Sequence, residues 1–294
     1  MTIAVIAHRG KTFGGGLAEL RRLLADEGYA DPLWYEVPKS RKAPKKARRA
    51  RKAGADLILV WGGDGMVQRC VDVLAGSDVS IGILPAGTAN LLASNLGIPR
   101  DLPSALEVAL RGAPRRLDLG KLNGEHFAVM AGAGFDGGMI RDADGSLKAR
   151  LGRLAYVWTG MRKLRDEAVP VEVRVDGRDW FDGRATCVLL GNLGKITGGV
   201  PAFPDARTDD GRLDVGVATA EGALQWARTF GRMVTGQARR SPFVHTTRAA
   251  KVEVRLGSAL PYELDGGARD RTTRLRARAV PQAITVRVPA VHGS

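Results

Sequence analysis

Apolar and polar residues alternate along the first 120 residues in the way expected of a β/α layer. Strands are predicted at Ile3–Ala7, Asp56–Trp61 and Ser80–Leu84, and helices at Leu17–Leu24 and Val67–Leu74. The second strand is almost continuously apolar. Such strands are typical of a parallel sheet that helices cover on both faces. This half is therefore predicted to be an α/β, doubly wound layer of the nucleotide-binding type.

From about residue 118 the pattern changes to short strands separated by hairpin turns. Asn123-Gly124 and Asp176-Gly177 are favoured two-residue hairpin turns. Further strands are predicted at Thr186–Leu190, Leu213–Val217, Lys251–Leu256, Leu260–Leu264 and Ile284–Val288, with helices at Leu147–Leu164 and Leu224–Val234. We expect two domains, an α/β domain at residues 1–118 and a mostly antiparallel, β-rich domain at residues 119–294.

Composition indicates a folded protein of the cytoplasm. A chain of 294 residues with 44% hydrophobic residues can bury a large core. Its apolar stretches are far shorter than the roughly 20 residues that span a bilayer, and Thr2–Ala7 does not resemble a signal peptide. Cys70 and Cys187 form no C-x-x-C pair, so we expect two buried, reduced thiols.

The net charge of +14 and the pI near 10.3 predict an anionic partner. The densest basic run is Lys39–Lys52, which is interpreted either as a solvated helix face after Pro44 or as a site for an anionic leaflet. Nucleic acid is not expected as a partner, because the run contains no aromatic residue to stack on bases. We expect a protein peripheral to the inner face of the membrane. Its oligomeric state stays open, with a homodimer as one alternative.

Two glycine-rich turns each join a predicted strand to a helix. Gly62-Gly63-Asp64-Gly65 follows the most apolar strand, and Pro85–Asn90 follows the next one. Glycines permit positive φ and close backbone approach, so their N–H groups and the helix N-terminus can face a polyphosphate. A tight turn capped by Asp64 is the alternative. Both turns fall at the carboxyl edge of the sheet, where open α/β sheets bind ligands, and this favours a nucleotide.

These two motifs, followed by Leu96-Gly97-Ile98-Pro99, resemble the diacylglycerol kinase catalytic-domain family, and the similarity extends through nearly the whole chain. Gly14-Gly15-Gly16 resembles the family's first nucleotide loop, with His8-Arg9 in place of the usual Asn-Pro. Met66 stands where threonine is commoner, which is similar to sphingosine kinases. The resemblance implies that nine residues bind the nucleotide: Gly62, Gly63, Asp64, Gly65, Met66, Val67, Gly87, Thr88 and Asn90.

The resemblance also implies an acceptor side in the second half. Gly132-Ala133-Gly134-Phe135-Asp136 resembles the family's acceptor motif, which implies that Asp136 lies near the lipid head group; a packing role for the glycines stays open. Tyr262–Gly267 resembles the family's Asp-Gly-Glu motif with Gly267 in the place of glutamate. The resemblance implies that Asp265 is the general base for the lipid hydroxyl, and a simple hairpin turn is the alternative.

Carboxylates gather around a turn at Pro204–Asp214. Hard cations bind to clustered oxygen atoms, and such a turn supplies carboxylate and carbonyl oxygens. The family resemblance implies a structural Mg²⁺ held by Asp210 and by the main-chain carbonyls of Arg207 and Arg212. An ordinary Asp-Gly β-turn is the alternative.

The resemblance as a whole implies a kinase that uses ATP and Mg²⁺ to phosphorylate a lipid hydroxyl, with diacylglycerol as acceptor and phosphatidic acid as product. Nicotinamide-dinucleotide kinases and phosphofructokinases share the Gly-Gly-Asp-Gly turn, but Pro85–Ala93 resembles lipid kinases. Gly10-Lys11-Thr12 lacks the first glycine of a P-loop. Two alternatives stay open, a sphingoid-base kinase and a catalytically silent nucleotide- or lipid-binding protein, the latter favoured by Gly267 and by the altered first loop.

Overall fold

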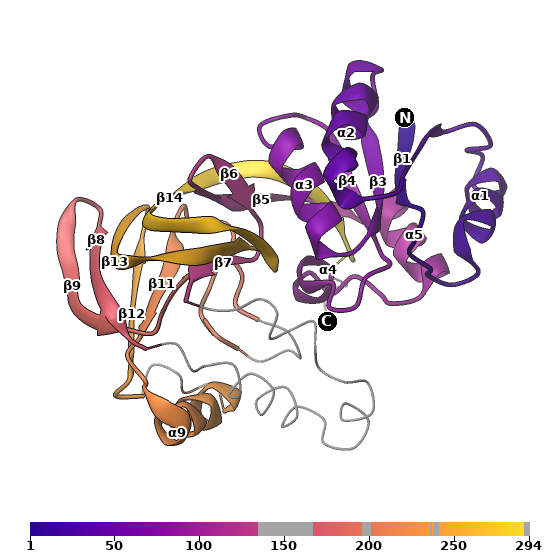
Figure 1. The fold of residues 1–294 in the computed structure, drawn as a ribbon. Coiled ribbons are helices and arrows are strands. Elements are labelled where there is room, and N and C mark those ends of the chain that lie inside the picture. The colour runs from indigo at the N-terminus through magenta and orange to yellow at the C-terminus, as the bar shows by residue number, and fades with distance from the viewer. Residues whose placement is uncertain (135–166, 196–200, 236, 238–240, 291–294) are drawn as a thin grey trace. The chain divides into compact units, whose positions relative to one another are not determined.

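A computed structural model describes residues 1–134, 167–195, 201–235, 237 and 241–290 of the chain (Figure 1). The chain divides into two compact units, Met1–Leu119 with Pro281–Ser294, and Gly120–Val280. The first boundary lies beside the position predicted from the sequence. The C-terminal stretch, however, groups with the first unit, because the last strand returns to pair there with a strand of the parallel sheet.

The first unit is a parallel sheet between helices (Figure 1). Its strands are β1 (Ile3–His8), β2 (Leu33–Val37), β3 (Leu57–Gly62), β4 (Ser80–Pro85) and the end of β14 (Gly267–Val288), in the order β2-β1-β3-β4-β14. Its helices are α1 (Gly16–Asp26), α2 (Ala43–Lys52), α3 (Asp64–Leu74), α4 (Leu91–Asn95) and α5 (Leu102–Arg111), with a 3₁₀ turn, η1, at Ser40–Lys42. All four strand pairings are parallel, as predicted.

Burial explains why this layer forms. Every residue of β3 is buried, as a strand covered on both faces requires. Helix α2 packs against α3, and Arg111 at the end of α5 pairs with Glu27 beside the end of α1. Close packing of α5 on the sheet depends on Gly82 in β4, where an added Cβ would lie 2.7 Å from Cβ of Ala109. The predicted doubly wound layer is confirmed.

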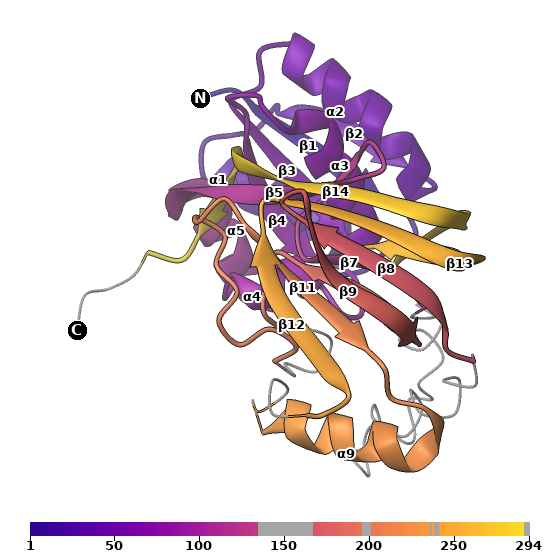
Figure 2. The same ribbon diagram turned by 90° about the vertical axis from the view of Figure 1, so that its left-hand side faces the viewer.

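The second unit is antiparallel and β-rich, as predicted. It contains β6 (Glu125–Phe127), β7 (Met130–Ala133), β8 (Val169–Val175), β9 (Arg178–Ala185), β10 (Cys187–Gly191), β11 (Leu213–Ala218), β12 (Val244–Ala249), β13 (Lys251–Leu264), most of β14 and the end of β5 (Ala113–Leu122). The strand order is β12-β11-β10-β7-β13-β14, and β8 pairs with β13 and β9. Helix α9 (Gly222–Val234) lies beyond the ends of β11 and β12 (Figure 2).

Turn chemistry fixes the hairpins of this unit. Asn123-Gly124 joins β5 to β6 and Asp176-Gly177 joins β8 to β9, and all four residues have positive φ, which confirms both predicted turns. Two strands were predicted at 251–256 and 260–264. They are one strand, β13, with a register shift between Arg255 and Leu260. The helix predicted at 147–164 lies outside the described residues.

Three further expectations concern single helices and residues. A helix is present at 222–234, close to the predicted one. Cys70 and Cys187 are buried free thiols, as predicted, and burial raises the pKa of each to about 12. Among the helices that the structure describes, none combines the length and apolar character needed to cross a bilayer.

Candidate functional site

The first glycine-rich turn joins β3 to α3. Gly63 is the N-cap of α3, with φ of −95° and ψ of −176°, which is extended backbone open to any residue. Its carbonyl accepts the N–H groups of Met66 and Val67 at 2.9 and 3.1 Å. The positive φ that the sequence suggested for these glycines is therefore not used, since Gly62, Gly63 and Gly65 are all absent from the positive-φ residues of the described chain. Close approach explains two of them, because a Cβ on Gly62 would lie 2.8 Å from Met66 and one on Gly63 would lie 3.1 Å from Cα of Gly87, whereas one on Gly65 would meet nothing within 4 Å.

The second turn follows β4 and is held together by Asn90. This residue has φ of 50° and is 7% exposed. Its amide Nδ2 donates to the carbonyls of Pro85 and Gly87 at 3.1 and 2.8 Å, and its Oδ1 accepts the N–H of Gly87 at 2.9 Å. One side chain thus satisfies three backbone groups of the turn. Asn90 shapes the turn from inside.

The two turns meet backbone to backbone. A Cβ added to Gly63 would lie 3.1 Å from Cα of Gly87, and one added to Gly87 would lie 2.4 Å from Cα of Gly63. The N–H of Ala86 also donates to the carbonyl of Gly62 at 3.1 Å. A side chain at Gly87 would force the turns apart, because contacts under 3.0 Å are not found for real Cβ atoms.

Asp64 ties the turns together electrostatically. Its Oδ1 accepts the N–H of Leu91, the first residue of α4. Burial raises the pKa of the Asp64 carboxyl above its ordinary value of 3.8, while hydrogen bonds from backbone N–H groups, that of Leu91 first, act in the opposite direction. Asp64 is also the first residue of α3, where a carboxylate interacts favourably with the helix dipole.

The nine residues predicted to bind a nucleotide fall into two groups. Gly63, Asp64, Gly65, Gly87 and Thr88 keep some exposure, and Thr88 is the most exposed of them. Gly62, Met66, Val67 and Asn90 are buried. Met66 is 1% exposed, and its side chain fills the space beside Gly62. The first group can touch a ligand and the second can support it. Their contacts with a nucleotide stay predictions.

The loop before α1, which contains Gly14 and Gly15, is anchored by Trp61, a residue that the sequence did not single out. Trp61 in β3 is completely buried, its Nε1–H donates to the carbonyl of Lys11 at 3.0 Å, and its ring meets Phe13 edge to face at 5.7 Å. Gly14 has φ of 54°, and the N–H of Gly15 donates to Glu19 at 2.6 Å. The tryptophan that precedes Gly62 could have signalled this contact, since a buried indole N–H needs an acceptor.

In the second unit, Asp265 lies in the hairpin turn between β13 and β14. It is 4% exposed and has φ of 47°, and with Gly266 it forms the predicted two-residue turn. Its carboxylate accepts the N–H groups of Ala128, Val129 and Met130 at 2.8, 2.8 and 2.9 Å. The carboxylate thus anchors the loop between β6 and β7. Its role as a general base stays a prediction.

The glycine after this turn has a neighbour that occupies the surrounding space. A Cβ on Gly267 would lie 3.0 Å from Nη1 of Arg269. The guanidinium of Arg269 in turn pairs with Glu125 on β6 through two bonds of 2.9 and 2.8 Å. Asp136, the predicted head-group residue, lies outside the described residues, and its role stays a prediction.

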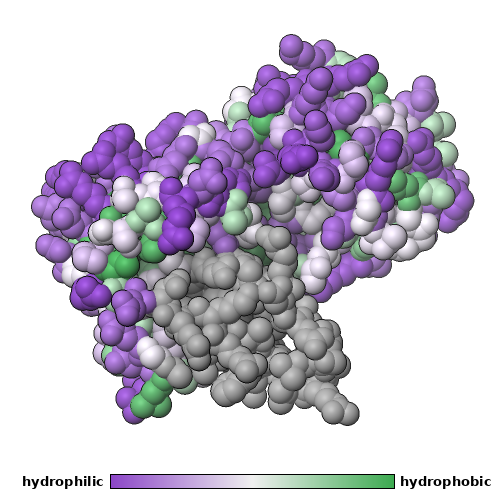
Figure 3. Space-filling view, viewed as in Figure 1, coloured by the Kyte–Doolittle hydropathy of each residue, from purple (hydrophilic) through white to green (hydrophobic). Residues whose placement is uncertain are grey.

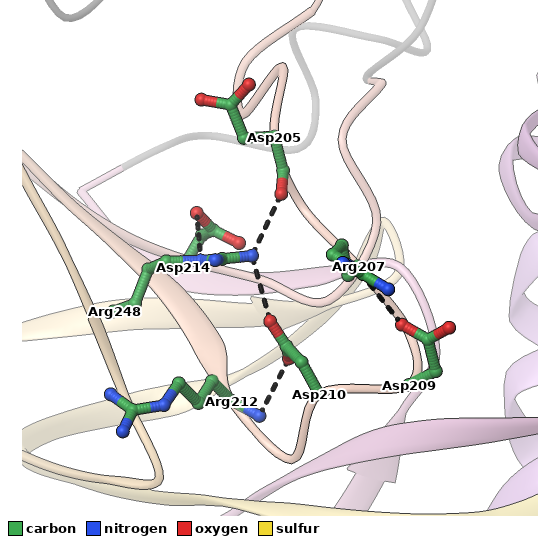
Figure 4. Close-up of polar contacts among 7 residues, drawn as sticks. All are labelled: Asp205, Arg207, Asp209, Asp210, Arg212, Asp214 and Arg248. Carbon is green, nitrogen blue, oxygen red and sulfur yellow. Dashed lines mark hydrogen bonds and ion pairs between the residues drawn. The ribbon is translucent and has the colours of Figure 1, made fainter.

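The acidic turn predicted to hold Mg²⁺ contains a guanidinium (Figure 4). Arg248 on β12 contacts Asp210 Oδ2 at 2.9 Å and the carbonyl of Asp205 at 2.9 Å, and it lies 3.5 Å from Asp214 Oδ1. The other oxygen of Asp210 accepts the N–H of Arg212 at 3.0 Å. Among the described residues, no group of three or more His, Cys, Asp or Glu could hold a metal ion. Both oxygens of Asp210 already have partners in this placement, while Mg²⁺ ligation by the main-chain carbonyls of Arg207 and Arg212 stays a prediction.

Parallel β3 and β4 with glycine turns at their carboxyl ends, together with an antiparallel unit, define the class of two-domain kinases that includes the lipid kinases. Residues 8–122 match the diacylglycerol kinase catalytic domain, and residues 129–288 match the YegS C-terminal NAD kinase beta sandwich-like domain. The chain belongs to the diacylglycerol kinase family. It is an enzyme of the lipid kinase type, a phosphotransferase.

Three individual proteins illustrate the similarity. A diacylglycerol kinase of Mycobacterium tuberculosis is 32% identical over 249 residues, which cover 82% of this chain and 79% of the relative. A probable YegS-like lipid kinase of Klebsiella pneumoniae is 28% identical over 277 residues, which cover 93% and 91%. The crystal structure of a putative diacylglycerol kinase from Bacillus anthracis has a TM-score of 0.79 at 23% identity, covering 98% and 96% of the two chains.

Proposed function

We propose that this chain transfers the γ-phosphoryl group of ATP to the hydroxyl of a lipid alcohol, with diacylglycerol as acceptor and phosphatidic acid as product. The observation that carries the proposal is the backbone contact between Gly63 and Gly87, which holds two helix-entry turns at one edge of a parallel sheet. Such turns are suited to bind phosphates through backbone N–H groups and helix N-termini. Membership of the family supports the transfer to a lipid.

Phosphoryl transfer depends mainly on positioning and charge neutralisation, so backbone groups can contribute much of the site. The N–H groups of the accessible turn residues, Gly63, Gly65 and Thr88, would contact the phosphates of ATP. Asp64 would keep the two turns at a fixed separation through its bond to Leu91, and Asn90 would keep the second turn in shape through its bonds to Pro85 and Gly87. Mg²⁺ that arrives with ATP would neutralise charge on the β- and γ-phosphates when bound.

Asp265 is proposed to accept the proton of the lipid hydroxyl, and Asp136 to contact the head group. Asp64 is the alternative base. Its raised pKa supports that alternative, because a general base works best when its pKa approaches the working pH. Mutation of each aspartate to asparagine distinguishes which of the two acts as the base.

The lipid acceptor implies work at a membrane surface, and the basic helix α2 is the proposed contact with anionic lipid. A sphingoid base is a second possible acceptor, supported by Met66 in the place of threonine. A catalytically silent binding protein is the alternative from another class. It is favoured by Gly267, which stands where the family's Asp-Gly-Glu pattern has its glutamate. Arg269, beside Gly267, is paired with Glu125.

A kinase assay with product identification tests the proposal. The protein is given ATP, Mg²⁺ and vesicles that contain diacylglycerol, monoacylglycerol or sphingosine, and products are identified by mass. We expect phosphatidic acid to form faster than any other product by about tenfold or more. Phosphorylated sphingosine as the main product would change the acceptor. Tight ATP binding without turnover on any lipid would establish the silent alternative.

Two glycine variants, compared by their apparent Kd for ATP, test the assignment of the two turns to the nucleotide. Gly87→Ala places a methyl group 2.4 Å from Cα of Gly63, so the turns separate, and the apparent Kd for ATP should rise by about tenfold or more. In Gly231→Ala the added methyl group meets nothing within 4 Å, and the residue lies within α9. Its ATP affinity should equal that of the parent. Unchanged affinity in a folded Gly87→Ala protein would refute the assignment of the turns.

A further inference from the structure

The acidic turn before β11 faces a basic residue of the neighbouring strand. Strands β11 and β12 are antiparallel, and their register places Arg248 directly opposite Asp214. Side chains directly opposite each other in a sheet interact. The register therefore brings the guanidinium beside the turn that contains Asp205 and Asp210.

One guanidinium contacts three separate parts of the turn (Figure 4). Its Nη2 lies 2.9 Å from Asp210 Oδ2 and 2.9 Å from the carbonyl oxygen of Asp205, and its Nε lies 3.5 Å from Asp214 Oδ1. These oxygens come from the beginning, the middle and the end of the turn. A planar guanidinium with several N–H donors is suited to join such groups.

Burial makes these contacts stronger than ordinary surface ion pairs. The side chain of Asp214 is 4% exposed, that of Asp210 is 21% exposed and that of Arg248 is 32% exposed. Exposed pairs contribute little to stability, whereas removing the cation that is paired with a shielded carboxylate is strongly destabilising. By contrast, Arg207 in the same turn pairs with Asp209 at 3.1 Å, and both side chains are more than half exposed.

We propose that Arg248 is the resident cation of this turn and replaces the divalent ion that the turn's carboxylates suggest. Asp210 uses one oxygen for Arg248 and the other for the N–H of Arg212. Mg²⁺ requires nearly octahedral oxygen ligands at about 2.0–2.1 Å and would also have to lie beside a positive guanidinium, which repels it. The turn therefore folds without metal, and the Mg²⁺ requirement of the protein is confined to its nucleotide.

Thermal unfolding without nucleotide tests this directly, because it needs no enzyme activity. The Tm of the parent protein should be the same in EDTA and in millimolar Mg²⁺ at matched ionic strength. Arg248→Ala should lower the Tm by about 4–10 °C in EDTA, and Mg²⁺ should restore at least half of that loss, because the freed carboxylates can then bind it. Arg248→Lys should keep most of the parent Tm, since it keeps the charge.

Two further variants identify the site of any Mg²⁺ effect. Adding Asp210→Asn to Arg248→Ala should abolish the recovery by Mg²⁺. Arg207→Ala, which removes an exposed arginine from the same turn, should leave the Tm and its indifference to Mg²⁺ unchanged. The proposal is overturned if Mg²⁺ raises the Tm of the parent and Asp210→Asn removes that rise, or if Mg²⁺ restores nothing to Arg248→Ala. Should Arg248→Ala fail to fold, the parent and Arg248→Lys measurements decide alone.

Discussion

Polar side chains in the candidate site bind mainly to the backbone of their own chain. Asp64 accepts the N–H of Leu91, Asn90 satisfies Pro85 and Gly87, and Asp265 accepts three N–H groups of the loop after β6. Buried polar groups need such partners, and a carboxylate without them would be costly. Each of these residues was selected from the sequence for ligand chemistry. Each also determines the local backbone, so its mutation affects geometry as well as chemistry.

Asp265→Asn separates these two roles. An amide keeps one acceptor oxygen but turns an NH₂ group toward backbone N–H donors, and bonds to a charged group are worth about 1.5–3 kcal/mol each. We therefore expect the Tm to fall by about 5–10 °C. The sequence alone does not reveal these three donors. If Asp265 is also the base, kcat measured well below the Tm should fall by about 10²- to 10⁴-fold.

The comparison with Asp64→Asn completes this test. A protein with Asp265→Asn that melts early but keeps most of its kcat would show that Asp265 only anchors the loop. In that case Asp64→Asn should produce the large fall in kcat. If Asp64 is the base, kcat should fall as the pH drops through a pKa that burial raises above the ordinary value of 3.8, and Asp64→Asn should remove that pH dependence.

At the scale of elements, local patterns predicted most of the fold. The strands at β1, β3, β4, β10 and β11 and the hairpin turns follow from apolar runs and from Asn-Gly or Asp-Gly pairs. Contacts between distant residues were not predictable in this way. Asp265 meets Ala128 across 137 positions, and Arg248 reaches Asp210 only because β11 and β12 pair. A single sequence shows residue types but not strand register, so neither contact had a local signal.

Helix α2 shows what a local pattern does determine. Its buried residues are Ala43, Ala47 and Ala50, so small side chains alone face the core. The opposite face is basic, and hydrophilic residues cover the surface over α2 in Figure 3. Lys46 and Arg49 also lie over the ring of Tyr35, at 5.4 and 5.7 Å from its centroid. The basic side chains of α2 other than Lys46 are exposed, and all of them, Lys46 included, keep at least partial access to an anionic surface.

Replacing four basic residues of α2 tests membrane contact at this scale. Changing Lys45, Lys46, Arg48 and Arg49 to glutamine should weaken binding to anionic vesicles by about tenfold or more at low salt, because each basic residue near such a surface contributes about 1 kcal/mol. High salt should reduce the difference. The control changes four exposed basic residues of the second unit to glutamine, Lys251, Arg274, Arg276 and Arg278.

The two variants lose the same net charge, so their difference reports position. Vesicle sedimentation over a range of salt concentrations measures it. Equal losses for both variants would assign binding to net charge alone and not to α2. Binding by the parent that is insensitive to salt would remove the electrostatic contact altogether.

At the scale of the whole molecule, two strands connect the units. Both β5 and β14 begin in one unit and end in the other. Within β14, Gln282 has φ of 46° and donates its N–H to Asp118 at 2.8 Å. Asp118 is 1% exposed, and it lies in β5. The first unit therefore needs residues from both ends of the chain, which a split at residue 118 would miss.

Truncation of the chain measures this dependence. In the first unit, β14 pairs with β4 through Thr285 and Val286, and Ile284, Val286 and Val288 are at most 8% exposed. Burial of such side chains contributes about 1.5–3 kcal/mol each, and total stability is only about 5–15 kcal/mol. A chain ending at Val280 should therefore lose most of the stability of the first unit and its ATP binding, although residues 8–122 remain intact. A chain ending at Ala290 keeps β14 and should match the parent in Tm and in ATP affinity, as measured by calorimetry. Normal ATP binding by the chain that ends at Val280 would show that β4 is stable without β14.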